Sequence, residues 1–468
     1  MARMRGISRA RFDALAAYCR DPRLLLLGEE IAWFEAADGN ILATIIFDKD
    51  DEFSGQILAR DLKDRFRWVA GTGNADGTGY FDMPEPAVIA MHDAVMSVAA
   101  DLEQHRRQGD ENGPPVDFFT PAVAQEKLHP NFVRLASGDG FTAARGIIGA
   151  TMRWYDDADG NFVEQFQTTG FDARMWELYL FAALTEANFV VARPRPAPDF
   201  LVRGLTGEFA LEATTINPSV GGDGQLISPP KPETTEEKKE YFKHYLPIRY
   251  AGPLTAKLRK AYWERPAASG KPLVFAIQDF HDRMSMVYSG SALATYLYGF
   301  DHEAHRDGGG RLRVIPRQVE EHRWGGKVVP TGFFNLPDGE HVSAVLFNSG
   351  GTLSKFNRMG VCAGFGVDNV VLIRQGTAID PDPNASEGAP YLHFVAEGYP
   401  ETWIEGMDVY HNPNALHALG PALLPGAAHH KLMAGGQVQT TLTGWKPVDS
   451  STSVLTFPAS PVPSARNQ

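Results

Sequence analysis

The sequence predicts an α/β fold, in which a mixed sheet is flanked by helices, preceded by a separate α+β domain. An apolar stretch without Gly or Pro at residues 175–187 predicts a helix. Short apolar or alternating runs at 189–192, 200–202 and 208–216 follow it and are typical of strands. A polar segment with a Pro-Pro pair at 106–117 separates these elements from an earlier hairpin pattern.

The chain length of 468 residues predicts two or three domains. A polar linker and a change of pattern along the chain give the boundaries. We predict an N-terminal α+β accessory domain at 1–105, a linker at 106–117, a core domain at 118–350, a C-terminal extension packed on the core at 351–449, and a disordered, Ser- and Pro-rich tail at 450–468.

Composition limits the classes of protein to which the chain can belong. Apolar residues make up 43% and charged residues 22%, which is typical of a soluble globular protein. Two cysteines, Cys19 and Cys362, exclude a disulfide framework and a cysteine-rich zinc cluster. The basic N-terminus lacks an apolar stretch after it, and no run is long enough to span a membrane, so we expect a cytoplasmic protein.

The N-terminal domain shows structural patterns and no chemical motif. Residues 9–19 predict a short helix, and residues 30–34 and 41–47 predict a hairpin. A strand at 66–69 and a long helix at 86–105 follow. We expect an accessory or partner-docking role for this domain.

The helix at 175–187 carries a carboxylate on an apolar face. Glu177 shares that face with Leu180, Phe181 and Leu184, at helical spacing. A carboxylate in such a place is costly unless it is paired, hydrogen-bonded or bound to metal. Alternatively, Glu177 only favours the positive N-terminal end of the helix.

Two further carboxylates belong to the strands that follow. Asp199 comes after Pro198 at the start of one strand, and Glu212 lies inside the strand at 208–216. If these strands are adjacent and antiparallel, the two carboxylates meet at one end. They would then repel each other unless a cation lies between them, and oxygen ligands suit Mg²⁺ or Mn²⁺.

These residues carry a resemblance to a known family. Glu177 on a helix, then Pro198-Asp199, then Glu212-Ala213-Thr214 resembles the core of the PD-(D/E)XK nuclease superfamily, the restriction-endonuclease-like fold. The resemblance covers about a quarter of the chain. It implies that the core domain has this fold and that Glu177, Asp199 and Glu212 bind a divalent metal, Mg²⁺ or Mn²⁺.

The sequence departs from the family at one position. The residue two after the strand acid is usually Lys in this superfamily, where it orients or activates water, but here it is Thr214. In the next helix Lys257 shares a face with Leu254 and Ala261, so we predict that Lys257 replaces the missing lysine, with Lys260 as a second candidate. The alternative is that these lysines form an ordinary solvated basic face.

Three functions follow from these residues. The first is a metal-dependent nuclease that cleaves phosphodiester bonds, in DNA in preference to RNA. The second is a catalytically impaired nuclease-fold protein that binds nucleic acid or a partner. The third is a different hydrolase whose site lies around four later histidines: His411, His417, His429 and His430. For these histidines we favour a structural role instead, in loops at contacts between domains or subunits.

Further expectations concern elements around the core. We predict a hairpin from residues 151–155 and 161–166 and a basic loop at 355–358. The net charge of −13 argues against a surface that is basic overall, so a nuclease would need a local basic lining. We expect no contact with membranes, and the length of chain outside the core is compatible with a homo-oligomer.

Overall fold

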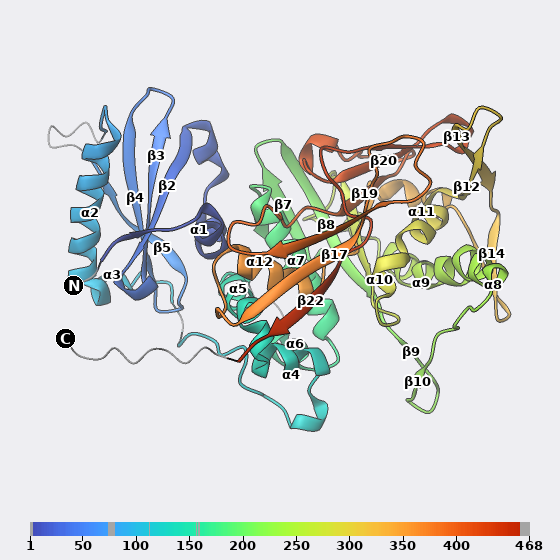
Figure 1. The fold of residues 1–468 in the computed structure, drawn as a ribbon, viewed down its shortest axis with the longest axis horizontal. Helices are drawn as coiled ribbons and strands as arrows, with labels where there is room; N and C mark the ends of the chain where they lie inside the picture. The colour runs from blue at the N-terminus through green and yellow to red at the C-terminus, as the bar shows by residue number, and fades with distance from the viewer. Residues whose placement is uncertain (1–2, 74–79, 112, 156, 158–159, 459–468) are drawn as a thin grey trace.

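The protein forms two units with separate sheets, which lie side by side in Figure 1. The smaller unit holds the N-terminal strands, and the larger unit holds the rest of the chain. This computed structural model describes residues 3–73, 80–111, 113–155, 157 and 160–458.

The N-terminal unit is an antiparallel sheet with one long helix against it. Helix α2 (Pro84–Ala100) covers one face of the sheet, and its buried residues recur at the spacing of a single helical face: Ala87, Met91, Val95 and Val98. The sheet order follows the chain: β1 (Arg5–Gly6), β2 (Gly28–Ala36), β3 (Ile41–Asp48), β4 (Phe53–Arg60) and β5 (Phe66–Thr72).

Helix α1 (Arg9–Ala16) joins this unit to the larger one. Phe12 and Leu15 pack on the face of the N-terminal sheet opposite to α2. Just after α1, the Tyr18 hydroxyl lies 2.8 Å from the Thr151 hydroxyl, and the Tyr18 ring stacks on Phe181 of the larger unit. Helix α1 and the residues just after it therefore pack between the two units.

The larger unit is built on an eight-stranded mixed sheet, which confirms the predicted α/β class. Strands β8, β11 and β16 are parallel neighbours, and each is buried over most of its length, as expected for strands covered on both faces. The order across the sheet is β21 (Val438–Thr441), β20 (Ala428–Leu432), β19 (Met407–His411), β16 (Ala344–Asn348), β11 (Leu273–Asp279), β8 (Gly207–Ile216), β7 (Phe200–Gly204) and β6 (Val190–Ala192).

Helices cover both faces of this sheet. One face packs against α5 (Thr142–Met152), α7 (Phe171–Glu186) and α12 (Leu353–Cys362). The other packs against α9 (Leu246–Leu258) and α11 (Gly290–Tyr298). Across the described ranges, no helix is both long enough and apolar enough to cross a membrane.

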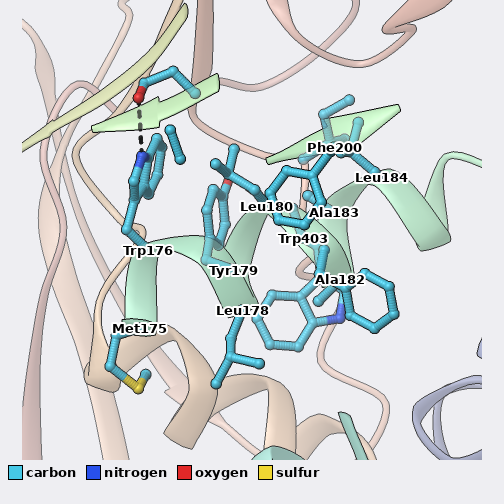
Figure 2. Packing of buried hydrophobic residues seen from close by; sticks show 14 of the residues in the cluster. Met175, Trp176, Leu178, Tyr179, Leu180, Ala182, Ala183, Leu184, Phe200 and Trp403 are labelled. Atoms are coloured by element: carbon cyan, nitrogen blue, oxygen red, sulfur yellow. Dashed lines mark hydrogen bonds between the residues drawn. The ribbon is translucent and has the colours of Figure 1, made fainter. Parts of the chain in front are cut away.

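Helix α7 is the most deeply buried of these helices. Its residues from Met175 to Thr185 are all buried, so the helix lies inside the protein rather than on its surface. Figure 2 shows Trp176 and Tyr179 directed from α7 towards the sheet, where Trp176 Nε1 donates to the carbonyl of Ala276 in β11 at 3.2 Å. The Tyr179 hydroxyl donates to the carbonyl of Trp403 at 2.9 Å.

Smaller elements complete the two units. They comprise short helices, exposed hairpins and a second, three-stranded sheet of β18, β17 and β22. The helices are α3 (Leu102–His105), α4 (Pro130–Ser137), α6 (Phe162–Gln167), α8 (Thr235–Glu240) and α10 (Ser285–Tyr288); the strands are β9 (Ser219–Val220), β10 (Leu226–Ile227), β12 (Phe300–Arg306), β13 (Leu312–Gln318), β14 (Glu321–Trp324), β15 (Lys327–Pro330), β17 (Val370–Ala378), β18 (Ala389–Val395) and β22 (Ser451–Thr456).

The structure corrects four expectations. The segment 351–449 does more than pack on the core, because it supplies strands β19, β20 and β21 of the main sheet. Disorder was the wrong prediction for the start of the tail, where β22 pairs with β17; residues 459–468 lie outside the described part. The expected hairpin of 151–155 and 161–166 is wrong, since residues 151–152 end helix α5 and residues 162–166 lie in helix α6. The expected basic loop at 355–358 lies inside helix α12.

A buried charge network attaches the three-stranded sheet to α12. Glu401 accepts two hydrogen bonds from Arg358, both at 2.7 Å, and lies 3.4 Å from Lys355 and 3.6 Å from Arg374. Burial alone would raise the pKa of Glu401, but the positive charges of Arg358 and Lys355 outweigh it and lower this pKa to about 2. The network therefore needs the ionised carboxylate to hold its cations.

We predict that Glu401→Gln lowers the free energy of unfolding by about 3–5 kcal/mol at pH 7, because it leaves buried cations without their counter-charge. Urea unfolding measures this change. The control is Glu303→Gln, which removes an exposed partner of Arg317 and should change stability by less than about 0.5 kcal/mol. Equal effects of the two variants would contradict a special role for the buried network.

Candidate active site

Adjacent strands bring two of the predicted carboxylates together. In the antiparallel pair of β7 and β8, Phe200 is opposite Leu211, so Asp199 lies beside Glu212. The backbone N–H of Asp199 donates to Glu212 Oε2 at 3.0 Å, and the backbone N–H of Ala213 donates to Asp199 Oδ2 at 2.8 Å. Each carboxylate is therefore held by the strand that carries the other.

The α9 side of the sheet supplies cationic and hydroxyl partners for Glu212. Side chains alternate along β8, and Leu211 and Ala213 pack in the α7-side core, which places Glu212 on the α9 face. Lys257, near the end of α9, donates to Glu212 Oε1 at 2.5 Å, and the Tyr262 hydroxyl donates to the same oxygen at 2.6 Å. Lys257 and Tyr262 are 45 and 50 residues from Glu212 in the sequence, and the position of α9 on the sheet brings both next to it.

Glu177 has a different set of partners. Arg174 Nη1 lies 2.9 Å from both of its carboxylate oxygens, the Tyr155 hydroxyl donates to Oε2 at 2.5 Å, and Arg193 lies 3.7 Å away. Tyr155 belongs to the core on the α7 face. The charge of Glu177 is thus already balanced. Over the residues with a described placement, no three His, Cys, Asp or Glu side chains are grouped as a ready metal site.

This arrangement raises the pKa of Asp199. Burial, and then the negative charges of Glu212 and Glu177, raise the pKa of Asp199 to about 7, while Lys257 opposes the rise. Two carboxylates that share a poorly hydrated place cannot both ionise at low cost. Groups with such shifts, next to a cavity, are concentrated at functional sites.

A cavity of about 500 Å³ opens beside the carboxylate pair. Its volume lies in the range of pockets that bind small ligands. The lining residues combine two acids, three cations, a tyrosine and two small apolar residues: Asp199, Glu212, Arg259, Lys260, Arg265, Tyr262, Pro196 and Ala197.

Comparison with protein-family models, with curated proteins and with solved structures finds no match. Two carboxylates, one of them paired with Lys257, and three further cations line one cavity, and this combination suits a phosphate-containing ligand with a divalent metal.

The remaining predicted residues occupy different places. Thr214 lies on β8, two residues beyond Glu212 and on the same face, opposite Ile277 of β11. Lys260 lines the cavity, with its Nζ 6.0 Å from the centre of the Tyr262 ring. The cation nearest to the strand acid therefore comes from α9, through Lys257, and not from the strand.

Sequence reasoning missed Tyr262 and Arg265. Tyr262 follows α9 in a short 3₁₀ turn, after Ala261 takes a left-handed conformation at φ 47°. That turn brings the tyrosine back towards β8 and ends the helix. No spacing or composition in the segment distinguishes this tyrosine from an ordinary core aromatic.

The four later histidines lie away from this cavity. In the sheet order, β11 and β16 separate β8 from β19 and β20, which carry three of them. His411 Nε2 is 2.8 Å from His429 Nδ1, and His430 is 2.7 Å from Asp408. The backbone carbonyl of His417 accepts a hydrogen bond from Ser343. These contacts connect strands and loops inside one unit.

We predict that Asp199→Asn stabilises the protein by about 1–3 kcal/mol at pH 8, measured by urea unfolding. Between the ordinary pKa of Asp, about 4, and the folded value of about 7, the native state keeps a proton that the unfolded state loses. Stability therefore falls as the pH rises through this interval, and asparagine removes that cost while it keeps an acceptor for Ala213 N–H.

The matched control is Asp61→Asn. Asp61 is also buried and also accepts backbone N–H groups, but it is paired with Arg65 at 2.7 Å. This variant should lose stability at pH 8. A loss of stability in Asp199→Asn as well would show that the Asp199 carboxylate serves only to hold the fold.

Proposed function

We propose that this chain is a metal-dependent nuclease that hydrolyses phosphodiester bonds in nucleic acid, in DNA in preference to RNA. The observation that carries the proposal is the Asp199–Glu212 pair, with Lys257 on Glu212, beside a cavity lined by cations. Repelling acids held at fixed positions next to free cations suit a site that binds a metal and a phosphate.

The order of elements supports the same proposal. Helix α7 is followed by the antiparallel strands β6, β7 and β8, then by the α9 crossover and by β11, which is parallel to β8. This order of helix, three strands, helix and strand agrees with the restriction-endonuclease-like core that the sequence resembles. The acids occupy the strands at which that family has its metal ligands.

The donor set fits Mg²⁺ or Mn²⁺. Mg²⁺ is commonly bound through one or two carboxylates, with water and substrate phosphate completing its coordination. Asp199 and Glu212 supply two carboxylates. Burial and then the charge of Glu212 raise the pKa of Asp199, and a cation would relieve the repulsion between the two carboxylates. The contacts of Glu177 give no support to its predicted role as a third ligand, and that role remains a prediction.

The reaction is hydrolysis of a phosphate diester. The oxygen of water bonds to phosphorus, one ester P–O bond breaks, and the leaving oxygen takes up a proton in place of the one that the water loses, so that the products are a phosphate monoester and a hydroxyl end. A bound metal supplies a more acidic water and neutralises charge at phosphorus. In this chain Asp199 and Glu212 would hold the metal, and Lys257, which donates to Glu212, would supply a positive charge for the negative charge that develops on the phosphate.

A binding module without catalysis is the second candidate. Thr214 at the position of the usual lysine favours it, as does the lack of a ready three-ligand group among the described residues. In this alternative Lys257 serves only as a permanent counter-charge for Glu212. The two candidates differ in cleavage and in the response to metal.

We predict that the protein cleaves nucleic acid with Mg²⁺ or Mn²⁺, and that Asp199→Asn and Glu212→Gln each lower the rate at least about 100-fold, because several kcal/mol of charge stabilisation are lost. Calorimetric titration with Mn²⁺ measures the metal site separately. Glu208→Gln is the control, since Glu208 is on the same strand but pairs with Arg203 at the exposed end. Cleavage that survives both site variants would overturn the proposal, and metal binding without cleavage would favour the binding module.

Lys257 gives an independent test. We predict that Lys257→Met lowers the cleavage rate about 10- to 100-fold while Mn²⁺ affinity is retained or increased, because Glu212 loses a competing cation. Lys257→Arg should keep part of the rate, since it keeps the charge. An unchanged rate in Lys257→Met would instead support the alternative in which Lys257 serves only as a counter-charge for Glu212.

A further inference from the structure

The cavity beside the acids has walls of opposite character. Pro196 and Ala197, in the segment before β7, form a small apolar wall, whereas Arg259, Lys260 and Arg265 form a cationic one. The acids Asp199 and Glu212 complete the lining. A ligand that fills the cavity must therefore combine a negative group with a less polar body.

The cationic wall consists of charges that have no carboxylate partner. Arg259, Lys260 and Arg265 are exposed, and within the described ranges none of them lies in an ion pair. By contrast, the neighbouring Lys257 and Lys271 pair with Glu212 and Glu208. Arg259 and Lys260 directly follow the end of α9, where the negative end of the helix dipole stabilises cations without consuming their hydrogen bonds.

Three cations without a carboxylate partner line one cavity, although the net charge of the chain is −13. Arginine and lysine that are left unpaired around a cavity suit phosphate, because guanidinium groups bind phosphate oxygens in pairs and lysine adds a point charge. Their number exceeds what one metal-bound phosphate needs. A second phosphate next to the reacting one would use them.

The depth of the site limits the form of the ligand. Glu212 is only 5% exposed, while the three cations reach solvent, so the reacting group has to enter and its neighbour stays at the mouth. A volume of about 500 Å³ is of the size used for small ligands and not for a double helix. A nucleotide of an intact duplex would have to leave its stack first, which costs a few kcal/mol.

We infer that the cavity takes one nucleotide of a single strand or of a frayed strand end, with the neighbouring phosphate on Arg259, Lys260 and Arg265. This inference rests on the proposed nuclease function. The sugar and base pack on Pro196 and Ala197, and the reacting phosphate lies at Asp199 and Glu212. Intact duplex is excluded from the site.

Binding without cleavage tests the inference. Fluorescence anisotropy in EDTA compares a ten-nucleotide single strand with a closed hairpin duplex of the same sequence. We expect the single strand to bind at least about tenfold more tightly, and the variant Arg259→Ala/Lys260→Ala/Arg265→Ala to bind it at least about tenfold more weakly than the unmodified protein. The slope of log affinity against log salt should fall by roughly 0.7, because the triple variant loses its contact with one phosphate of the single strand.

The control removes the same charge elsewhere. Lys49, Arg311 and Lys327 are exposed and lie outside the cavity, so Lys49→Ala/Arg311→Ala/Lys327→Ala should change affinity less than about twofold. Circular dichroism checks that both triple variants are folded. Equal binding of duplex, equal effects of the two triple variants, or no binding of nucleic acid at all would overturn the inference.

The outcomes for binding and for cleavage are distinguishable. Single-strand binding that depends on the cationic wall, without cleavage in Mg²⁺ or Mn²⁺, would reject the nuclease and leave the ligand class supported. Cleavage that requires Asp199, together with a preference for duplex, would support the nuclease and reject the single-strand inference.

Discussion

Two carboxylates that repel each other are fixed side by side by backbone hydrogen bonds, and the site depends on this constraint. Asp199 and Glu212 each accept an N–H from the strand of the other, so neither can turn away without breaking a bond of the β7–β8 pair. Burial, together with this repulsion, raises the pKa of Asp199. Neutral residues at these two positions would give a more stable sheet.

The rest of the larger unit makes this constraint rigid. Helix α7 is buried along most of its length and is fastened to β11 through Trp176 (Figure 2), while α9 covers the opposite face and delivers Lys257 and Tyr262 to Glu212. Because both faces of the sheet are covered, its central strands are almost wholly apolar and the carboxylates are the exception. Strands from the last third of the chain widen the same sheet, so the segment after residue 350 belongs to the core.

The local sequence pattern predicted a helix or strand correctly where its apolar period matches the burial of its side chains. The apolar helix around Glu177, the strand that contains Glu212 and the hairpin of β2 and β3 were all predicted from the sequence and are confirmed. Prediction failed where distant contacts decide. The segment at 355–358 looked like a basic loop, but Glu401 lies more than forty residues away and allows Lys355 and Arg358 to be buried in a helix.

The sequence by itself determined the kinds of residue and the strands that carry them: the acids Asp199 and Glu212, their antiparallel neighbourhood and the basic helix that follows. Only the tertiary structure decided the pairing, because the position of α9 across the sheet cannot be read from spacing along the chain. It placed Lys257 and Tyr262 on Glu212, and it left Glu177 with Arg174 and Tyr155. Local periodicity fixes which face a side chain takes, but contacts over tens of residues depend on how whole elements pack.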